Sequence, residues 1–171
     1  EEQNLDEVRA ALETALNAAL EQFNAARETE GNALAQDLAV RVAALRESLA
    51  AVTARAPEIQ AEFETQLRER IQELALEPGI KEERLAIEVA LMADKRDINE
   101  EIVRLESHLT RVDELLGAPE PAGHELGFIA QEIQREINTM GSKLRDIQTT
   151  REVVRMKSEL EKFREQIQNI E

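Results

Sequence analysis

Apolar residues recur at steps of three and four along almost the whole chain, and this period most constrains its fold. It matches the 3.6 residues of a helical turn, so each run places its apolar side chains along one side of a helix. The first run consists of Leu5, Val8, Leu12, Leu16, Leu20 and Phe23. Only 2% of the residues are aromatic, and strong helix formers such as Ala, Leu, Glu and Arg dominate. The sequence therefore predicts an all-α protein built from long helices.

Residues 1–77 are predicted to form a helical hairpin or stalk. A first helix is expected to be interrupted at Gly31, and a second follows with its apolar side chains again on one face. A third helix is expected over about 58–76, because Pro57 suits the first turn of a helix better than an interior position. This region shows no catalytic grouping, so spacing, dimerisation or oligomerisation is its expected role.

Residues 78–171 are predicted to form a second helical domain, beginning after the turn signal of Pro78 and Gly79. Its first helix is expected over about 81–116, followed by a loop over 117–123 that contains two prolines and two glycines. The remaining helical stretch, about 124–171, is expected to break near 138–142, where Gly141 stands.

Composition excludes some classes of site. The chain has no cysteine, so disulfides and thiolate metal sites are ruled out, and any metal ligands must be carboxylates, imidazoles or carbonyls. No apolar run approaches the roughly 20 residues of a membrane span. The net charge of −15 taken alone argues against nucleic-acid binding. Residues 143–157 depart from this balance, because their basic residues outnumber the acidic ones.

A row of polar residues follows one side of the predicted helix 81–116. Asp97, Glu101, Arg104 and His108 are separated by four, three and four positions, which places them one turn apart on the same side. Two carboxylates, a guanidinium and an imidazole in one line can hold a divalent metal or transfer protons. Rows of this kind also arise as solvated helix faces joined by weak ion pairs, and spacing alone leaves that alternative open.

A second polar group follows the loop. Glu132 and Glu136 are four residues apart and can point to one site, with Gln131 and Arg135 beside them. A helix that begins near Ser142 would present free N–H groups to a phosphate, with Lys143 next to it. A plain helix junction capped by the serine would give the same pattern.

Three segments carry a resemblance to a known family: residues 83–94 (ERLAIEVALMAD), 96–108 (RDINEEIVRLESH) and 127–143 (GFIAQEIQREINTMGSK). Together with the end of the chain, 157–171 (KSELEKFREQIQNIE), they resemble the C-terminal region of the YicC-like bacterial endoribonucleases. The resemblance is dense over about 80–171 and weaker over the predicted stalk.

The resemblance implies metal-dependent cleavage of single-stranded or structured RNA in the bacterial cytoplasm, by a homo-oligomer, expected to be a hexamer, with a channel for RNA. It also implies a further N-terminal domain of mixed α/β character in the intact protein, so we expect this chain to be a fragment.

The resemblance nominates the functional residues, and helical spacing allows them to converge. An oxygen-coordinated Mn²⁺ or Mg²⁺ would neutralise the phosphate and activate the nucleophile. The candidate catalytic residues are His108, Glu101 and Asp97. The candidate metal ligands are Glu88, Asp97, Glu101, Glu132 and Glu136. The candidate RNA-binding residues are Arg84, Arg104, Arg135 and Lys143.

RNA recognition is expected to depend on the phosphate backbone. Single-strand binders without sequence preference commonly stack bases on aromatic rings. The four phenylalanines, Phe23, Phe63, Phe128 and Phe163, all stand at predicted core positions. Composition and period alone also fit an alternative from another class, a helical scaffold or RNA-binding adaptor without catalysis.

Overall fold

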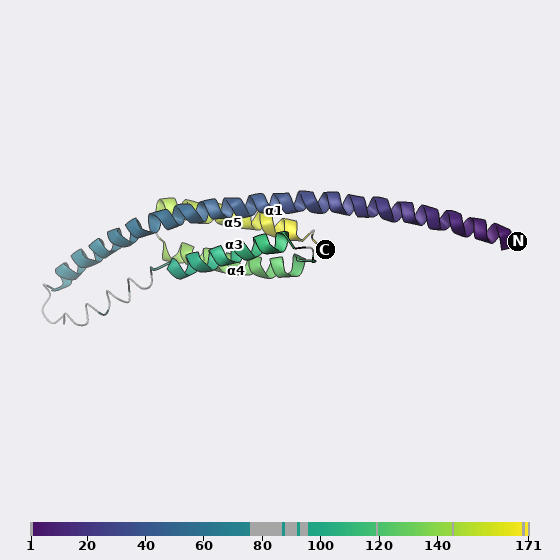
Figure 1. The fold of residues 1–171 in the computed structure, drawn as a ribbon. Helices are drawn as coiled ribbons and strands as arrows, with labels where there is room; N and C mark the ends of the chain where they lie inside the picture. Colours follow the sequence, from purple (N-terminus) through teal and green to yellow (C-terminus); the bar gives the residue numbers. More distant parts are fainter. Residues whose placement is uncertain are drawn as a thin grey trace. The chain divides into compact units, whose positions relative to one another are not determined.

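The structure, a computed structural model, describes residues 2–75, 87, 92, 96–118, 120–144, 146–168 and 170. Its helices are α1 (Glu2–Ala75), α3 (Asn99–Leu116), α4 (Gly123–Lys143) and α5 (Ile147–Ile167), shown in Figure 1. These described ranges contain no strand, and the prediction of an all-α protein is confirmed. Within the same ranges, no helix is both long and apolar enough to cross a membrane.

Helix α1 is continuous, so both predicted interruptions are wrong. Gly31 and Pro57 lie inside it. A helix interior tolerates glycine at a cost of about 1 kcal/mol and proline at about 3 kcal/mol relative to alanine. Alanine and glutamate, both strong helix formers, flank Pro57, and the buried side chains of Val52 and Ile59 anchor α1 on either side of it. A single long helix fits the predicted stalk, whereas the hairpin does not occur within residues 2–75.

The chain divides into two units, Glu1–Leu38 and Ala39–Glu171. In the first unit the apolar stripe predicted from the sequence faces solvent, each of its side chains being about half exposed or more: Leu5, Val8, Leu12, Leu16, Leu20 and Phe23. A lone exposed apolar side chain is ordinary, but a continuous stripe indicates a surface that can associate with another apolar surface.

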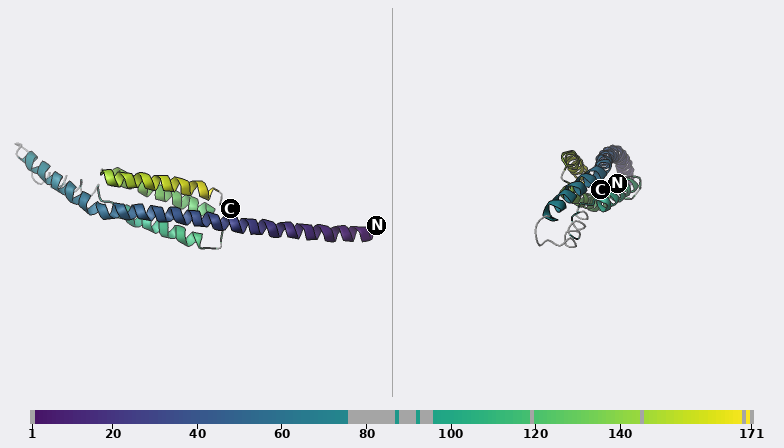
Figure 2. Two further views of the ribbon diagram at one scale, coloured as in Figure 1. Left: turned by 90° about the horizontal axis from the view of Figure 1, so that it is seen from above. Right: turned by 90° about the vertical axis from the view of Figure 1, so that its left-hand side faces the viewer.

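In the second unit, the later turns of α1 pack with α3, α4 and α5 around one apolar core (Figures 1 and 2). Its largest fully buried side chains include Leu45, Leu105, Leu109, Leu126, Ile133, Met140, Met156, Leu160 and Phe163. Ion pairs join α1 to its neighbours on two sides: Arg46 Nη1 lies 2.6 Å from Asp113 Oδ2 on α3, and Arg155 Nη2 on α5 lies 2.6 Å from Glu47 Oε2. This bundle positions the polar residues predicted to be functional.

The junction between α4 and α5 lies later than predicted. Helix α4 runs through Gly141 and Ser142 to Lys143, so the expected break there is wrong. A methyl group on Gly141 would lie 3.0 Å from Val153 Cγ1 of α5, which shows that this glycine permits close packing of two helices rather than a break. Ser142 Oγ donates to the backbone oxygen of Thr139, 2.8 Å away. No helix begins at Ser142, so the free helix-start N–H groups on which a phosphate site there depended are not present at this residue.

Asp146 caps the start of α5. Its Oδ2 accepts hydrogen bonds from the backbone N–H groups of Gln148 and Thr149, each at 3.0 Å, which satisfies two of the free donors at the helix start. The hydrogen bond from the Thr149 N–H is the largest cause that holds the pKa of the Asp146 carboxyl below its ordinary value. The positive charge of Arg55 and the hydrogen bond from Gln148 act in the same direction.

We expect Asp146→Ala to lower the melting temperature of the chain by a few degrees at neutral pH, measured by circular dichroism. Because the pKa is lower in the folded than in the unfolded state, the carboxylate stabilises the fold fully above the unfolded value. That stabilisation is lost as the pH falls below about 4 and through the folded pKa. The difference between wild type and variant should therefore shrink in acid, and a constant difference would contradict this account.

Candidate metal and RNA site

A row of polar side chains runs between α3 and α4. Its members follow one another at intervals of three, four and three residues along α3, and of seven, four and seven residues along α4. The row, called the polar seam below, consists of Glu101, Arg104, His108 and Arg111 on α3 and Glu125, Glu132, Glu136 and Lys143 on α4. Numbers rise along α3 while those of the opposing residues fall along α4, so the two helices are antiparallel. At its ends, Lys143 Nζ lies 2.7 Å from Glu101 Oε1 and Arg111 Nη2 lies 2.7 Å from Glu125 Oε1.

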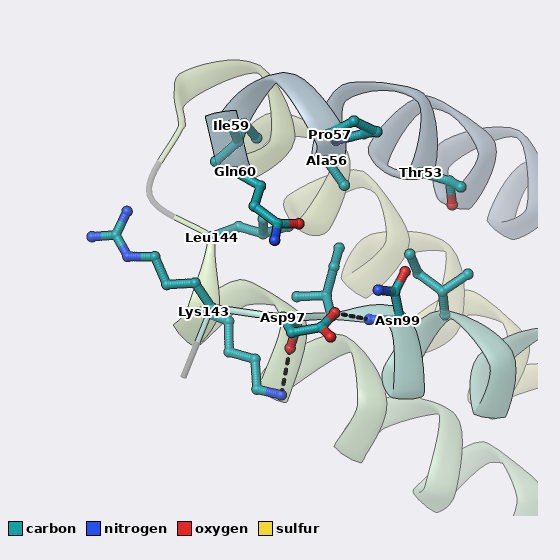
Figure 3. A pocket seen from close by; sticks show the side chains of 12 residues that line it. Thr53, Ala56, Pro57, Ile59, Gln60, Asp97, Asn99, Lys143 and Leu144 are labelled. Carbon is teal, nitrogen blue, oxygen red and sulfur yellow. Dashed lines mark hydrogen bonds between the residues drawn. The ribbon is translucent and has the colours of Figure 1, made fainter. Parts of the chain in front are cut away.

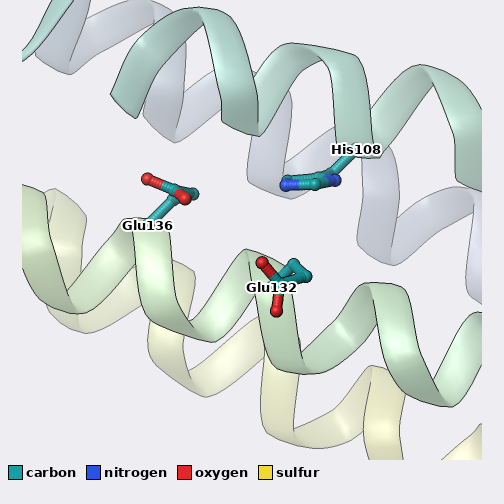
Figure 4. A group of neighbouring side chains, drawn as sticks. All are labelled: His108, Glu132 and Glu136. Atoms are coloured by element: carbon teal, nitrogen blue, oxygen red, sulfur yellow. The ribbon is translucent and has the colours of Figure 1, made fainter. Parts of the chain in front are cut away.

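Three of the predicted site residues meet at the middle of the polar seam. One ligand atom from each of His108, Glu132 and Glu136 lies within 4.8 Å of the other two. Figure 4 shows the His108 ring projecting from α3 toward the two carboxylates on α4. His108 and Glu132 are half-buried, and Glu136 is only 3% exposed. These three residues are called the triad below.

The triad suits a divalent cation. A buried carboxylate needs a partner of opposite charge or several hydrogen bonds. Glu136 has an ion pair with Arg104, but Oε1 and Nη1 are 3.9 Å apart, too far for a hydrogen bond. Glu132 also has a long ion pair, since its Oε2 lies 3.7 Å from Arg135 Nη1. Two carboxylates held this loosely, with an imidazole beside them, offer the oxygen and nitrogen ligands that Mn²⁺ accepts, and Mg²⁺ would rely mainly on the oxygens.

Glu101, predicted as a ligand and a catalytic residue, lies outside the triad. Its carboxylate is 5% exposed and accepts a hydrogen bond from Lys143 Nζ at 2.7 Å, while its other oxygen, Oε2, is buried without a hydrogen-bond partner. Lys143, predicted to contact phosphate, therefore has its charge directed into the protein. This ion pair fastens the start of α3 to the end of α4.

Asp97, the other predicted catalytic carboxylate, precedes α3 instead of lying within a helix. Its Oδ1 accepts a hydrogen bond from the backbone N–H of Asn99 at 2.8 Å, and its backbone oxygen accepts one from Lys143 Nζ at 2.8 Å (Figure 3). These residues border a pocket of about 270 Å³ beside Pro57 of α1. Asp97 thus stands before α3, whereas Glu101 shares one side of α3 with His108, as predicted, but is not a member of the triad.

The predicted RNA-binding arginines that the structure describes flank the triad. Arg104 projects from α3 and contacts Glu100 as well as Glu136, with half of its side chain exposed. Arg135 projects from α4 and is more exposed still. One guanidinium from each helix therefore stands beside the carboxylates. Arg84 and Glu88 lie outside the described residues.

Sequence reasoning missed two parts of this surface. The three- and four-residue spacing of the α3 row continues to Arg111, which donates from Nε and Nη2 to Glu125. Its hydrogen bond to Glu114, followed by those to Glu125, raises the pKa of Arg111 above its ordinary value. The second miss is Phe128, predicted to be in the core but 60% exposed on α4. Phe23 is also exposed, whereas Phe163 is buried as predicted.

The family model for the C-terminal region of YicC-like endoribonucleases matches residues 52–171, which contain the whole polar seam. The chain belongs to the YicC-like endoribonuclease family. The resemblance in the sequence is therefore confirmed. The match begins within α1, so the later turns of α1 form part of the YicC-like region together with α3, α4 and α5.

Two curated members of the YicC-like family are similar along essentially the whole chain. A protein of Clostridioides difficile (strain 630), named "Probable endoribonuclease YicC", is 41% identical over 171 residues, covering 99% of this chain and 58% of the relative. One of the same name from Haemophilus influenzae (strain ATCC 51907 / DSM 11121 / KW20 / Rd) is 31% identical over 171 residues, covering 100% of this chain and 59% of the relative. The chain thus spans somewhat under three fifths of the length of either relative.

Proposed function

We propose that the chain is the catalytic region of a metal-dependent endoribonuclease that acts on single-stranded or structured RNA in the bacterial cytoplasm. The observation that carries the proposal is the triad of His108, Glu132 and Glu136, whose ligand atoms lie within 4.8 Å of one another in a member of an endoribonuclease family. Spacing alone left a solvated helix face as an alternative. His108, which belongs to that row, is half-buried and lies beside the buried Glu136, and this argues against a solvated face at this point of the row.

The chain's own residues would divide the work as follows. Glu132 and Glu136 would supply the oxygen ligands and His108 a nitrogen ligand, the first two from α4 and the third from α3. A bound Mn²⁺ or Mg²⁺ supplies positive charge at the phosphate and lowers the pKa of a bound water or hydroxyl. Arg104 and Arg135 can turn from their long ion pairs toward phosphate oxygens, which a guanidinium binds with two parallel hydrogen bonds.

Cleavage of a labelled single-stranded RNA in the presence of Mn²⁺ or of EDTA tests the proposal, with the products separated on a gel. We expect cleavage that requires the metal and is lost in His108→Ala. Cleavage that persists in EDTA or in His108→Ala would refute the triad as the metal site. RNA that binds without being cut in Mn²⁺ would instead favour the adaptor alternative.

RNA binding should weaken steeply as salt is added. The binding surface adjoins Arg104 and Arg135, and each phosphate that a guanidinium neutralises releases counterions from the nucleic acid. With a few such contacts we expect affinity to fall by roughly tenfold or more between 50 and 200 mM salt. Fluorescence anisotropy of a labelled RNA measures the slope. Salt-insensitive binding would contradict phosphate recognition by these arginines.

Homo-oligomerisation is also part of the proposal, and the exposed apolar stripe of Glu1–Leu38 supports it. A second copy of the chain presents an identical stripe, so two copies can cover each other's apolar side chains. We expect Leu12→Glu, a charge in the middle of the stripe, to shift sedimentation toward smaller species. Thr14→Glu, which adds the same charge at an exposed residue on the opposite side of the helix, serves as the control. Equal sedimentation of Leu12→Glu and wild type would contradict association through this stripe.

A further inference from the structure

Phe128 is a large aromatic side chain that the bundle leaves in water. It is 60% exposed on α4, whereas Leu126 and Ile129 on the same helix are buried. The surface beside it is open, because a methyl group built on Gly127 would meet no atom within 4 Å. Its ring therefore presents a free face that contributes little to the core.

The position of Phe128 sets it apart from the other exposed apolar residues of the second unit. It stands four residues before Glu132 and eight before Glu136, so the three side chains lie on successive turns along one side of α4. One turn of a helix rises about 5.4 Å, which places the ring next to the triad. Arg135, seven residues further along, lies on the same side. The exposed ring thus belongs to the surface on which the triad and its arginines lie.

We propose that Phe128 stacks against a nucleobase of single-stranded RNA next to the phosphate bound at the triad. This inference rests on the proposed function. A strand that places one phosphate between Arg104 and Arg135 carries its neighbouring base toward the exposed ring. Every base has an aromatic face, and stacking on an aromatic side chain strengthens binding by roughly five- to hundredfold per base. Phe128 would then orient the strand and influence which bond is cut, beyond the backbone contacts expected from the sequence.

Paired probes test the stacking. One probe is a short single-stranded 2′-O-methyl oligoadenylate, and the other is an abasic oligomer of equal length and charge, each bound in the presence of Mn²⁺. We expect wild type to prefer the oligoadenylate by about five- to tenfold, the lower end of the stacking range. Phe128→Ala should lose this preference while binding the abasic oligomer as wild type does. Phe128→Trp, which keeps an aromatic face, should retain it.

The outcomes separate this inference from the proposed function. If wild type and Phe128→Ala prefer the oligoadenylate equally while metal-dependent RNA cleavage is intact, the stacking role is overturned and the proposed function stands. Binding of neither probe to wild type overturns RNA binding, and the stacking role falls with it. Because Phe128 is mostly exposed, both variants should keep the wild-type melting temperature, and this measurement identifies any loss that comes from misfolding.

Discussion

Glu136→Gln should reduce metal-dependent RNA cleavage by about a hundredfold or more, since loss of a metal ligand costs at least as much as loss of a group supporting one. Glutamine keeps the size of the side chain and removes its charge, so the change tests the carboxylate and leaves the packing of α4 intact. Glu136 is the most buried member of the triad. Electron paramagnetic resonance of free Mn²⁺ should show a parallel loss of binding in the absence of RNA.

Glu125→Gln on the same helix is the matched control. It removes the same charge from α4, but Glu125 pairs with Arg111 and lies outside the triad. We expect it to retain Mn²⁺ binding and cleavage close to wild type. If both variants lost activity equally, the general negative charge of the polar seam would be responsible, and the triad would have no special role.

Lys143→Met should lower the free energy of unfolding by about 2–4 kcal/mol, because it leaves the buried Glu101 carboxylate without its cation. We expect a smaller loss of stability than for a fully buried ion pair, because the side chain of Lys143 is about a quarter exposed. Urea denaturation followed by circular dichroism measures the change. This expectation treats Lys143 as a structural residue, in contrast to its sequence-based prediction as a phosphate ligand.

The double variant Lys143→Met, Glu101→Leu distinguishes the two roles. Replacing both members removes the unpaired charge and should restore most of the lost stability. If Lys143 mainly bound phosphate, Lys143→Met would weaken RNA binding without lowering the free energy of unfolding. That result would return Lys143 to the RNA-binding set and leave Glu101 available for another partner.

The all-α class could be predicted from sequence, because the three- and four-residue period of apolar residues is a local signal that does not depend on tertiary contacts. The ends of the helices could not. Gly31, Pro57 and Gly141 are all residues that favour helix ends, yet each lies inside a helix. Pro57 lies between the buried side chains of Val52 and Ile59, and Gly141 lies close to Val153 on another helix. The true start of α5 depends on Asp146, whose role as a cap was not recognised.

The candidate site could also be predicted only in part. Helical spacing correctly placed Arg104 and His108 on one side of α3 and Glu132 with Glu136 on one side of α4. Which residues oppose each other depends on the offset between the helices, and spacing within each helix does not determine that offset. The observed offset puts Lys143 beside Glu101 and brings both glutamates to His108. The exposure of Phe128 was likewise not predicted.

The triad draws one ligand from α3 and two from α4, and this distribution has a thermodynamic consequence. An ion that bridges them would be a crosslink that fastens two helices of the bundle. By linkage, a metal at a hundred times its dissociation constant would stabilise the folded state by about 2.7 kcal/mol. The supply of divalent cation would then set how firmly α3 is held to α4 as well as the rate of reaction. Metal scarcity would loosen this part of the bundle and stop its chemistry in a single event.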